Sequence, residues 1–101
     1  MEITHKDNPD GGFFLAEEEG KRMGFLSYEW ANDTEFAILH TVVEEEFQGK
    51  GIARALLNAA ADFARAKGYR IQPLCPYAQK VFARDAAYDD VNAIPSRKPS
   101  M

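Results

Sequence analysis

The chain has 101 residues, of which 46% are hydrophobic and 28% are charged, a composition typical of one globular domain. A core of this size forms without disulfides or a metal ion, and no metal site is predicted. The net charge of −4 and the lack of a Lys/Arg stripe argue against nucleic acid as the main partner. The single cysteine, Cys75, excludes an internal disulfide and fits the reducing cytoplasm. No apolar run predicts a signal peptide or a membrane span, and the oligomeric state stays open.

The first half of the chain predicts an antiparallel meander. A short edge strand is expected at residues 3–6, with longer strands at residues 13–18 and 22–30, because turn-forming residues separate them at 8–12, 19–21 and 32–33. A fourth strand is expected at residues 35–43. Its apolar residues fall at both odd and even positions, which is typical of a central strand that is covered on both faces.

The second half predicts one βαβ unit. Apolar residues recur at helical spacing after a glycine turn, and Gly68 follows as the expected C-terminal cap. A strand is expected at residues 69–74, parallel to the strand at 35–43 because a helix intervenes, and a final helix at residues 79–88. The fold class is therefore α/β or α+β with a mixed sheet. Residues 1–91 form one domain, and residues 92–101, rich in Pro, Ser and charge, are expected to be a flexible tail.

The strand at 35–43 and the following helix are joined by a turn that contains Gln48, Gly49, Lys50 and Gly51. Glycines at a strand-to-helix turn let the backbone approach a ligand closely. The first N–H groups of the helix have no partner within it, and the helix dipole favours negative charge there. The turn therefore predicts a binding site for a phosphate-bearing molecule.

Two common phosphate-binding motifs do not fit this turn. The P-loop requires a glycine five positions before Gly49, where the chain has Glu44. It also requires Ser or Thr after Lys50, where the chain has Gly51. The dinucleotide motif G-x-G-x-x-G fails because Arg54 replaces the third glycine, and a Rossmann fold needs more parallel strands than this chain supplies.

A third motif fits. The run Gln48-x-x-Gly51-x-Ala53 matches Q/R-x-x-G-x-G/A, the acyl-coenzyme A motif of the GNAT acetyltransferase superfamily. With its flanking strand, helix and parallel strand, the chain resembles this family over about residues 13–88. The stretches Leu-His-Thr at 39–41 and Pro-Leu-Cys-Pro-Tyr at 73–77 resemble its compact single-domain branch. The resemblance implies a sheet whose parallel strands splay apart. The chain lacks the long helical segment that larger members carry between their first two strands, so no acceptor is implied.

By this resemblance the acetyl donor is acetyl-coenzyme A. Its pyrophosphate would lie on the backbone N–H groups of residues 49–54, where the side chains of Lys50 and Arg54 either add charge-assisted contacts or stay solvated. Its pantothenate arm would pair with the backbone of residues 41–43 like an added strand, and an N–H near Val43 would stabilise the oxyanion. The cofactor-binding residues implied are Thr41, Val42, Val43, Gln48, Gly49, Lys50, Gly51, Ile52, Ala53 and Arg54.

Two residues are candidates for catalysis. His40, in an apolar strand, is either a hydrogen-bonded core residue or, by the resemblance, the general base for the acceptor amine. Cys75 is a small buried side chain, a proton donor to the leaving thiolate, or a nucleophile in a ping-pong route. His40 could activate Cys75 only within hydrogen-bond reach, and we favour direct transfer. Tyr77 is a further candidate acid, or a ring packed under the last helix.

The predicted function is acetyl-coenzyme A-dependent N-acetylation of an amine on a small molecule or a protein, in the cytoplasm. The alternative is a non-catalytic module that binds coenzyme A or acyl-coenzyme A. A third hypothesis is a small interaction protein in which the glycine turn is only structural. The sequence names no acceptor.

Overall fold

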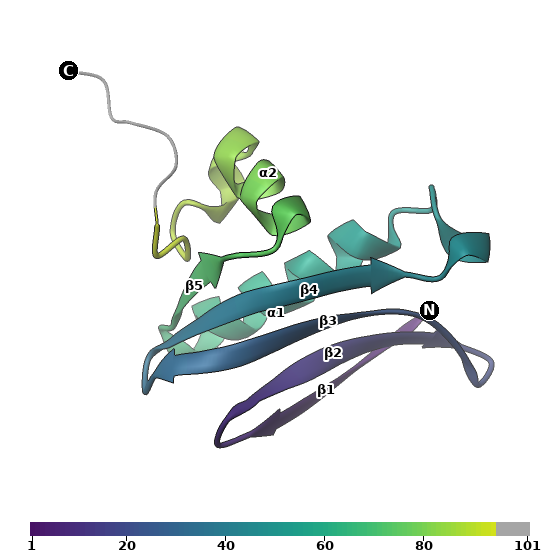
Figure 1. Ribbon diagram of the computed structural model, residues 1–101, viewed down its shortest axis with the longest axis horizontal. Coiled ribbons are helices and arrows are strands. Elements are labelled where there is room, and N and C mark those ends of the chain that lie inside the picture. Colours follow the sequence, from purple (N-terminus) through teal and green to yellow (C-terminus); the bar gives the residue numbers. More distant parts are fainter. Residues whose placement is uncertain (95–101) are drawn as a thin grey trace.

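The computed structural model describes residues 1–94 of the chain (Figure 1). The strands of these residues are β1 (Glu2–Asn8), β2 (Gly11–Glu18), β3 (Lys21–Asn32), β4 (Glu35–Val43) and β5 (Arg70–Pro73). The helices are α1 (Ile52–Lys67) and α2 (Pro76–Arg84), with single 3-10 turns η1 (Glu45–Phe47) and η2 (Ala86–Tyr88). The predicted α/β class with a mixed sheet is confirmed.

The five strands lie in the order β1-β2-β3-β4-β5. The first four form the predicted antiparallel meander, and β5 pairs in parallel with β4 after the α1 crossover. β1 is longer than the expected residues 3–6, because it pairs with β2 along its whole length, from Glu2 opposite Glu17 to Asn8 opposite Gly11. β4 has the predicted bounds.

Helix α1 begins and ends at glycines. Gly51 precedes it with φ 79°, and Gly68 closes it in the left-handed region, donating its N–H to the carbonyls of Ala64 and Arg65. The helix packs against the sheet through one stripe, and the buried residues of that stripe are Ile52, Leu56, Leu57, Ala60, Ala61 and Ala64. The alanines let the helix approach the strands closely, so the stripe and the sheet share one core with Phe36 and Ile38 of β4.

The bounds predicted for the last helix are wrong. α2 begins at Pro76 rather than at residue 79, because Cys75 caps it: its Sγ accepts the Ala78 N–H at 3.3 Å, and proline is favoured as the first helical residue. The helix ends at Arg84. Asp85 then caps the separate turn η2, accepting the Ala87 N–H at 2.9 Å.

The expected tail begins at residue 92, and its first residues lie against β5. The Ile71 N–H donates to the Val91 carbonyl at 2.6 Å, and the Ala93 N–H donates to the Ile71 carbonyl at 2.8 Å. Asn92 is 3% exposed. Residues 95–101 of the expected tail lie outside the described residues.

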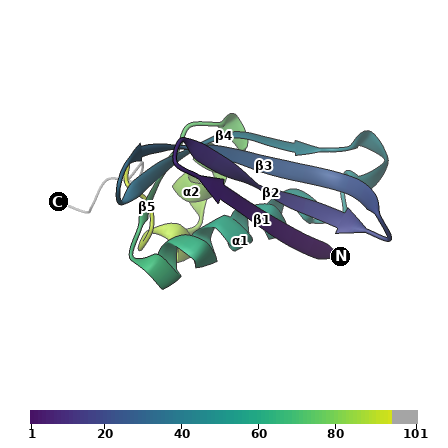
Figure 2. The ribbon, with the colours of Figure 1, turned by 90° about the horizontal axis from the view of Figure 1, so that it is seen from below.

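The two faces of the meander differ. α1 covers one face (Figure 2). The other face, called here the open face, carries Phe13 and Val42, which are 38% and 41% exposed. Coverage of β4 on both faces, expected for the whole strand, therefore holds for Phe36 to Ile38 but not for His40 and Val42. Within residues 1–94, β1 joins β2 through residues 9–10 alone, so this connection supplies no segment to cover the open face.

A polar network that the sequence did not predict lies at the end of the sheet away from the glycine turn. The Tyr28 hydroxyl donates to Asp7 Oδ1 at 2.6 Å, so it accepts from His5 Nε2 at 2.7 Å. Trp30 Nε1 also donates to Asp7 Oδ1, at 2.8 Å. The His5 ring stacks on Phe14, with centroids 4.1 Å apart. Burial lowers the pKa of His5 below its ordinary value, against the opposing charge of Asp7.

Candidate active site

The pairing of β4 with β5 stops halfway along β4. The parallel ladder joins Glu35–Ile38 to Arg70–Pro73. Beyond it, the N–H groups of Leu74 and Cys75 both donate to the Ile38 carbonyl, at 3.1 and 3.0 Å, and the chain then turns into α2. Within the described residues, no strand pairs with residues 39–43 on this side. The predicted splay of the parallel strands is therefore present, and it opens at Ile38.

The free edge of β4 presents backbone groups. The Glu44 N–H donates to the Met23 carbonyl at 2.8 Å, so the peptide groups of Glu44 face β3. Neighbouring residues in a strand direct their peptide groups to opposite edges. Val43 and Thr41 therefore direct their N–H and carbonyl groups to the open edge, and Gln48 Nε2 lies 3.4 Å from the Val43 carbonyl. A bulge at Leu39, where Ser27 pairs with His40 and Tyr28 with Ile38, bends the strand at the start of this edge.

The glycine turn places the start of α1 beside this edge. Gly49 and Gly51 have φ near +80°, a conformation that L side chains rarely adopt. A Cβ at either glycine would meet no atom within 4 Å, so both border open space. The first hydrogen bond of α1 runs from the Ala55 N–H to the Gly51 carbonyl at 3.0 Å, and no side chain caps the helix. The N–H groups of residues 52–54 precede this bond and have no acceptor within the helix.

A cavity of about 320 Å³, called here the glycine-turn cavity, lies beside the free edge of β4 and the glycine turn. It lies between the edge of β4, the start of α1 and the start of α2. Its lining residues are Thr41, Val43, Phe47, Gln48, Gly49, Gly51, Ile52, Ala53, Arg54 and Tyr77. Eight of these were expected to bind a cofactor. Two expected residues, Val42 and Lys50, are exposed and do not line it.

Three charged side chains near the cavity are already paired. Arg54 donates through Nε to the Tyr88 hydroxyl at 2.7 Å and through Nη2 to Asp85, so its guanidinium points toward η2. Of the nearby acidic residues, Glu46 pairs with Lys21 at 2.8 Å and Glu44 with Arg22 at 3.5 Å. The two glutamates thus face the β2–β3 turn, and the first turn of α1 contains no acidic residue to oppose an anion.

Cys75 lies behind the cavity wall and is 3% exposed. Its Sγ is 3.3 Å from the Ala78 N that donates to it and 3.4 Å from Thr41 Oγ1. The sulfur accepts a hydrogen bond from the Ala78 N–H, and its S–H group can donate a hydrogen bond to the Thr41 hydroxyl. Thr41 lines the cavity, so it connects the buried sulfur to the space where a ligand would lie.

His40 lies on the other face of the sheet. It neighbours Thr41 in β4, and successive side chains of a strand point to opposite faces. Its side chain is exposed, which excludes the buried core role, and it pairs in register with Ser27. The hydrogen-bond partners found for the Cys75 sulfur within residues 1–94 are Thr41 and Ala78, not His40. Activation of Cys75 by His40 is thus not supported by the geometry.

The cavity also has two aromatic walls. Phe47, which the sequence did not assign to the site, supplies one, and Tyr77, the further candidate acid, supplies the other. Burial raises the pKa of Tyr77 above its ordinary value. Phe47 could have been found as the one apolar residue directly before the motif glutamine. The contact between the Thr41 hydroxyl and Cys75 had no signal in the sequence, because the two residues are 34 positions apart.

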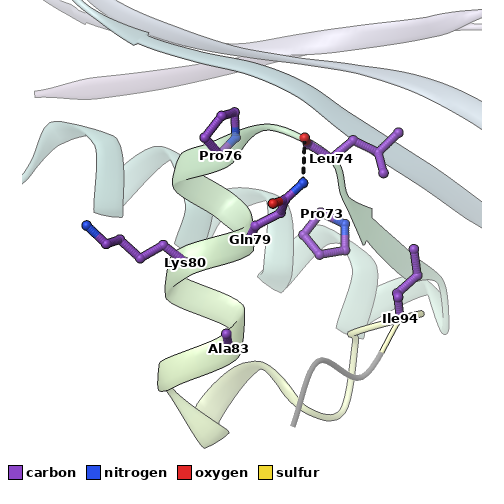
Figure 3. Close-up of a pocket in the computed structure, with 7 residues that line it drawn as sticks. All are labelled: Pro73, Leu74, Pro76, Gln79, Lys80, Ala83 and Ile94. Atoms are coloured by element: carbon purple, nitrogen blue, oxygen red, sulfur yellow. Dashed lines mark hydrogen bonds between the residues drawn. The ribbon is translucent and has the colours of Figure 1, made fainter.

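A second hollow, of about 520 Å³, lies between the end of β5 and the outer side of α2 (Figure 3). Leu74, Gln79 and Ile94 are among its lining residues, and Gln79 Nε2 donates to the Leu74 carbonyl at 3.0 Å. None of the predicted site residues lines it. Within residues 1–94, no three His, Cys, Asp or Glu side chains are placed to hold a metal ion, and neither helix has the length and apolarity to cross a membrane.

Residues 12–91 match the family of GCN5-related N-acetyl-transferases, so the chain belongs to this family of acetyltransferases. A 71-residue stretch is 37% identical to an uncharacterized N-acetyltransferase of Methanocaldococcus jannaschii. That stretch is 64% of this chain but only 31% of the length of the archaeal protein.

One solved structure supports the same assignment, and a second shares the fold. A GCN5-like candidate N-acetyltransferase from Staphylococcus aureus is 26% identical, with a TM-score of 0.73 over 95% of this chain and 90% of its own. The PaiA N-acetyltransferase of Thermoplasma acidophilum, solved in complex with coenzyme A, is 23% identical. Its TM-score is 0.54 over 61% of this chain and 40% of its own, a likeness that shows the fold alone.

Proposed function

We propose that this chain transfers an acetyl group from acetyl-coenzyme A to an amine, by direct attack with both substrates bound, and that it does so in the cytoplasm. The observation that carries the proposal is the glycine-turn cavity. It joins a free strand edge, unbonded N–H groups at the start of α1, and a thiol behind Thr41.

The residues present fit the donor. The N–H groups of residues 52–54 and the open space at Gly49 and Gly51 suit a pyrophosphate, because the ligand can approach where no Cβ stands. The free edge at Thr41 and Val43 suits the amide groups of the pantothenate arm, which would add to β4 like a strand. Arg54 is held by Asp85 and Tyr88, so we assign it to the cavity wall, and Lys50 to solvent until a phosphate is bound.

The reaction requires two proton movements. The amine nitrogen bonds to the acetyl carbon, the C–S bond of the thioester breaks, the amine loses one proton and the departing sulfur gains one. His40 is the candidate base for the amine, because it stands exposed on the face from which an acceptor can reach the edge of β4. Thr41 would donate its hydroxyl proton to the sulfur and take the thiol proton of Cys75 in exchange. The Val43 N–H is the candidate donor to the oxyanion.

Calorimetry with acetyl-coenzyme A tests the binding part of the proposal. The enzymatic part is tested by measuring acetyl transfer to a panel of primary amines, monitored by the release of free thiol. His40→Ala should lower turnover by about a hundredfold, typical of lost acid–base catalysis. Cys75→Ala should lower it by about five- to tenfold, the value of its hydrogen bond with Thr41, while donor affinity stays within a few-fold in both variants. Unchanged turnover in both variants would overturn the residue assignments. An acetyl adduct on Cys75 in mass spectra would overturn direct transfer.

The alternative function is a non-catalytic coenzyme A-binding module. One observation favours it: within residues 1–94 no helix covers the open face, so the acceptor side is not enclosed. Donor binding without transfer to any amine would establish the alternative.

A further inference from the structure

A hollow on the open face, separate from the glycine-turn cavity, lies beside His40. It measures about 330 Å³, and its lining residues are Gly12, Phe13, Leu15, Arg22, Phe25 and Ser27. We call it the meander hollow. We propose that it binds the apolar body of the acceptor, and that the acceptor is a small primary amine carried on an aromatic or branched aliphatic group. The inference rests on the proposed acetyl transfer.

The two faces of the sheet would serve different substrates. Thr41 and Val43 line the cavity on the α1 side of β4, and this side would be filled by the donor. An acceptor must therefore come from the open face. The free edge of β4 is reachable from both faces because β5 turns away after Ile38.

The register of the strands places His40 beside the hollow. On the open face, His40 lies opposite Ser27, Ser27 opposite Phe13, and Phe13 opposite Lys6, in one row across four strands. Ser27 is small, so the row dips between His40 and Phe13. Neighbouring strands are about 4.8 Å apart, which places the hollow within about 10 Å of His40, the length of a small aryl-alkyl amine.

The lining of the meander hollow is mostly apolar. The floor of the hollow is two aromatic rings and a leucine, and Phe13 remains 38% exposed, so an apolar group bound there would bury apolar surface on both partners. Volumes of this size are typical of small-molecule sites. A lone exposed aromatic is ordinary, but a hollow of this composition one strand away from a candidate base is a binding surface.

The charged side chains around the hollow suit an amine with its nitrogen toward His40. Arg22 closes the far end of the hollow, but it pairs with Glu44 at 3.5 Å and so presents no isolated positive charge to an amine. At the near end, Glu29 lies two residues beyond Ser27 on the same face and is exposed. The net charge of −4 also favours an approaching cation. The arrangement suits an ammonium at the His40 end and an apolar body toward Phe13 and Phe25.

Acetyl transfer at saturating acetyl-coenzyme A, compared between phenethylamine and ethanolamine, tests the proposal. We expect kcat/KM for phenethylamine to be about ten- to hundredfold higher, since burial of the ring distinguishes the two amines. Phe13→Ala should raise the KM for phenethylamine about tenfold and lower the phenethylamine-to-ethanolamine ratio of kcat/KM by the same factor. Ile94→Ala is the matched control: Ile94 is 50% exposed and lines the other hollow. This control should keep the preference.

Equal kcat/KM for the two amines, or an equal loss for both in Phe13→Ala, would overturn the proposal. Sedimentation that finds a dimer dissociated by Phe13→Ala would also overturn it, because a second copy would then cover the face. If donor binds and no amine is acetylated, the proposed function fails. The hollow is then tested by titrating phenethylamine into the protein loaded with coenzyme A. NMR shifts confined to residues 13–15 and 25–27 support the hollow, and their absence rejects it.

Discussion

The two halves of β4 differ in what lies beside them. Residues 35–38 are hydrogen-bonded to β3 on one side and to β5 on the other, and Phe36, Ala37 and Ile38 are buried. Residues 39–43 pair with β3 alone among the described strands, and their side chains alternate between the glycine-turn cavity and the open face. One strand therefore serves as core up to Ile38 and as a candidate site beyond it.

The capacity of β4 to bind a ligand comes from its unpaired half. A fully paired strand has no free backbone groups to offer, whereas a strand that loses its neighbour keeps a row of donors and acceptors. The loss happens at one carbonyl, that of Ile38, which accepts from two successive N–H groups as the chain turns into α2. Substitutions in each half of β4 should therefore have different effects.

The largest effect is expected in the paired half. Ile38→Ala removes a side chain that is 0% exposed and should lower the free energy of unfolding by about 2–5 kcal/mol, because it leaves a cavity under α1. Val42→Ala in the unpaired half is the control. Its side chain is 41% exposed, so the loss should stay near about 0.5 kcal/mol. Urea unfolding measures both, and similar losses would contradict the division.

The next effect concerns the glycine turn. Gly51→Ala should weaken acetyl-coenzyme A binding about ten- to hundredfold. The added Cβ would stand where the ligand approaches the backbone, and one lost charge-assisted hydrogen bond corresponds to about 1.5–3 kcal/mol. Gly20→Ala is a matched control, with φ +77° and equally open surroundings at the β2–β3 turn. Both variants carry the same backbone strain, so calorimetry isolates the ligand contact. Equal donor affinities in the two variants would show that the turn is only structural.

A smaller effect is expected at the contact between the two elements that splay. Thr41→Val keeps the shape of the side chain but removes the hydroxyl beside Cys75, and turnover should fall about five- to tenfold, the value of one hydrogen bond of about 1–1.5 kcal/mol. Thr41→Ser keeps the hydroxyl and should restore the rate. Steady-state kinetics at saturating donor checks both. Loss of activity in the serine variant as well would point to packing rather than proton transfer.

The smallest effect lies at the far end of the sheet, beside the paired half. The folded protein lowers the pKa of His5, while the unfolded chain keeps the ordinary value near about 6.5. The unfolded state therefore binds protons more readily below that pH. The contribution of His5 to the free energy of unfolding should be fully present above about pH 7. It should decrease as the pH falls through about 6.5 toward the pKa of His5 in the folded protein.

His5→Gln should flatten this slope in thermal melts between about pH 5.5 and 8. Asp90, whose pKa is lowered by its hydrogen bond with Arg65, loses its contribution only as the pH falls below about 4, outside this range. An unchanged slope in His5→Gln would assign the pH dependence to other groups.

Most strands and the first helix could be predicted because their signals are local. Turn residues bound the meander, and the helical spacing from Ile52 with a following Gly68 defines α1. The predicted helix at 79–88 starts three residues late because the cap of α2 is a cysteine, a residue type that rarely acts as one. It ends late because the separate turn η2 follows α2 and reaches Tyr88.

The candidate site divides in the same way. The motif run from Gln48 identified the glycine turn, since phosphate-binding turns depend on backbone conformations that only certain residues allow. Contacts between distant residues had no such signal. That Thr41 rather than His40 touches Cys75, and that Arg54 is held by Asp85, depends on which strand faces and helix ends meet.

The family, the mixed sheet and the place of the glycine turn could be predicted because each follows from short-range patterns of residue type. The face that each candidate residue occupies depends on tertiary packing. A bulge at Leu39 and the departure of β5 after Ile38 put Thr41 and His40 on opposite sides of one strand. The open face next to His40 also appeared only in the tertiary structure, because burial is a property of what packs against a surface rather than of the surface itself.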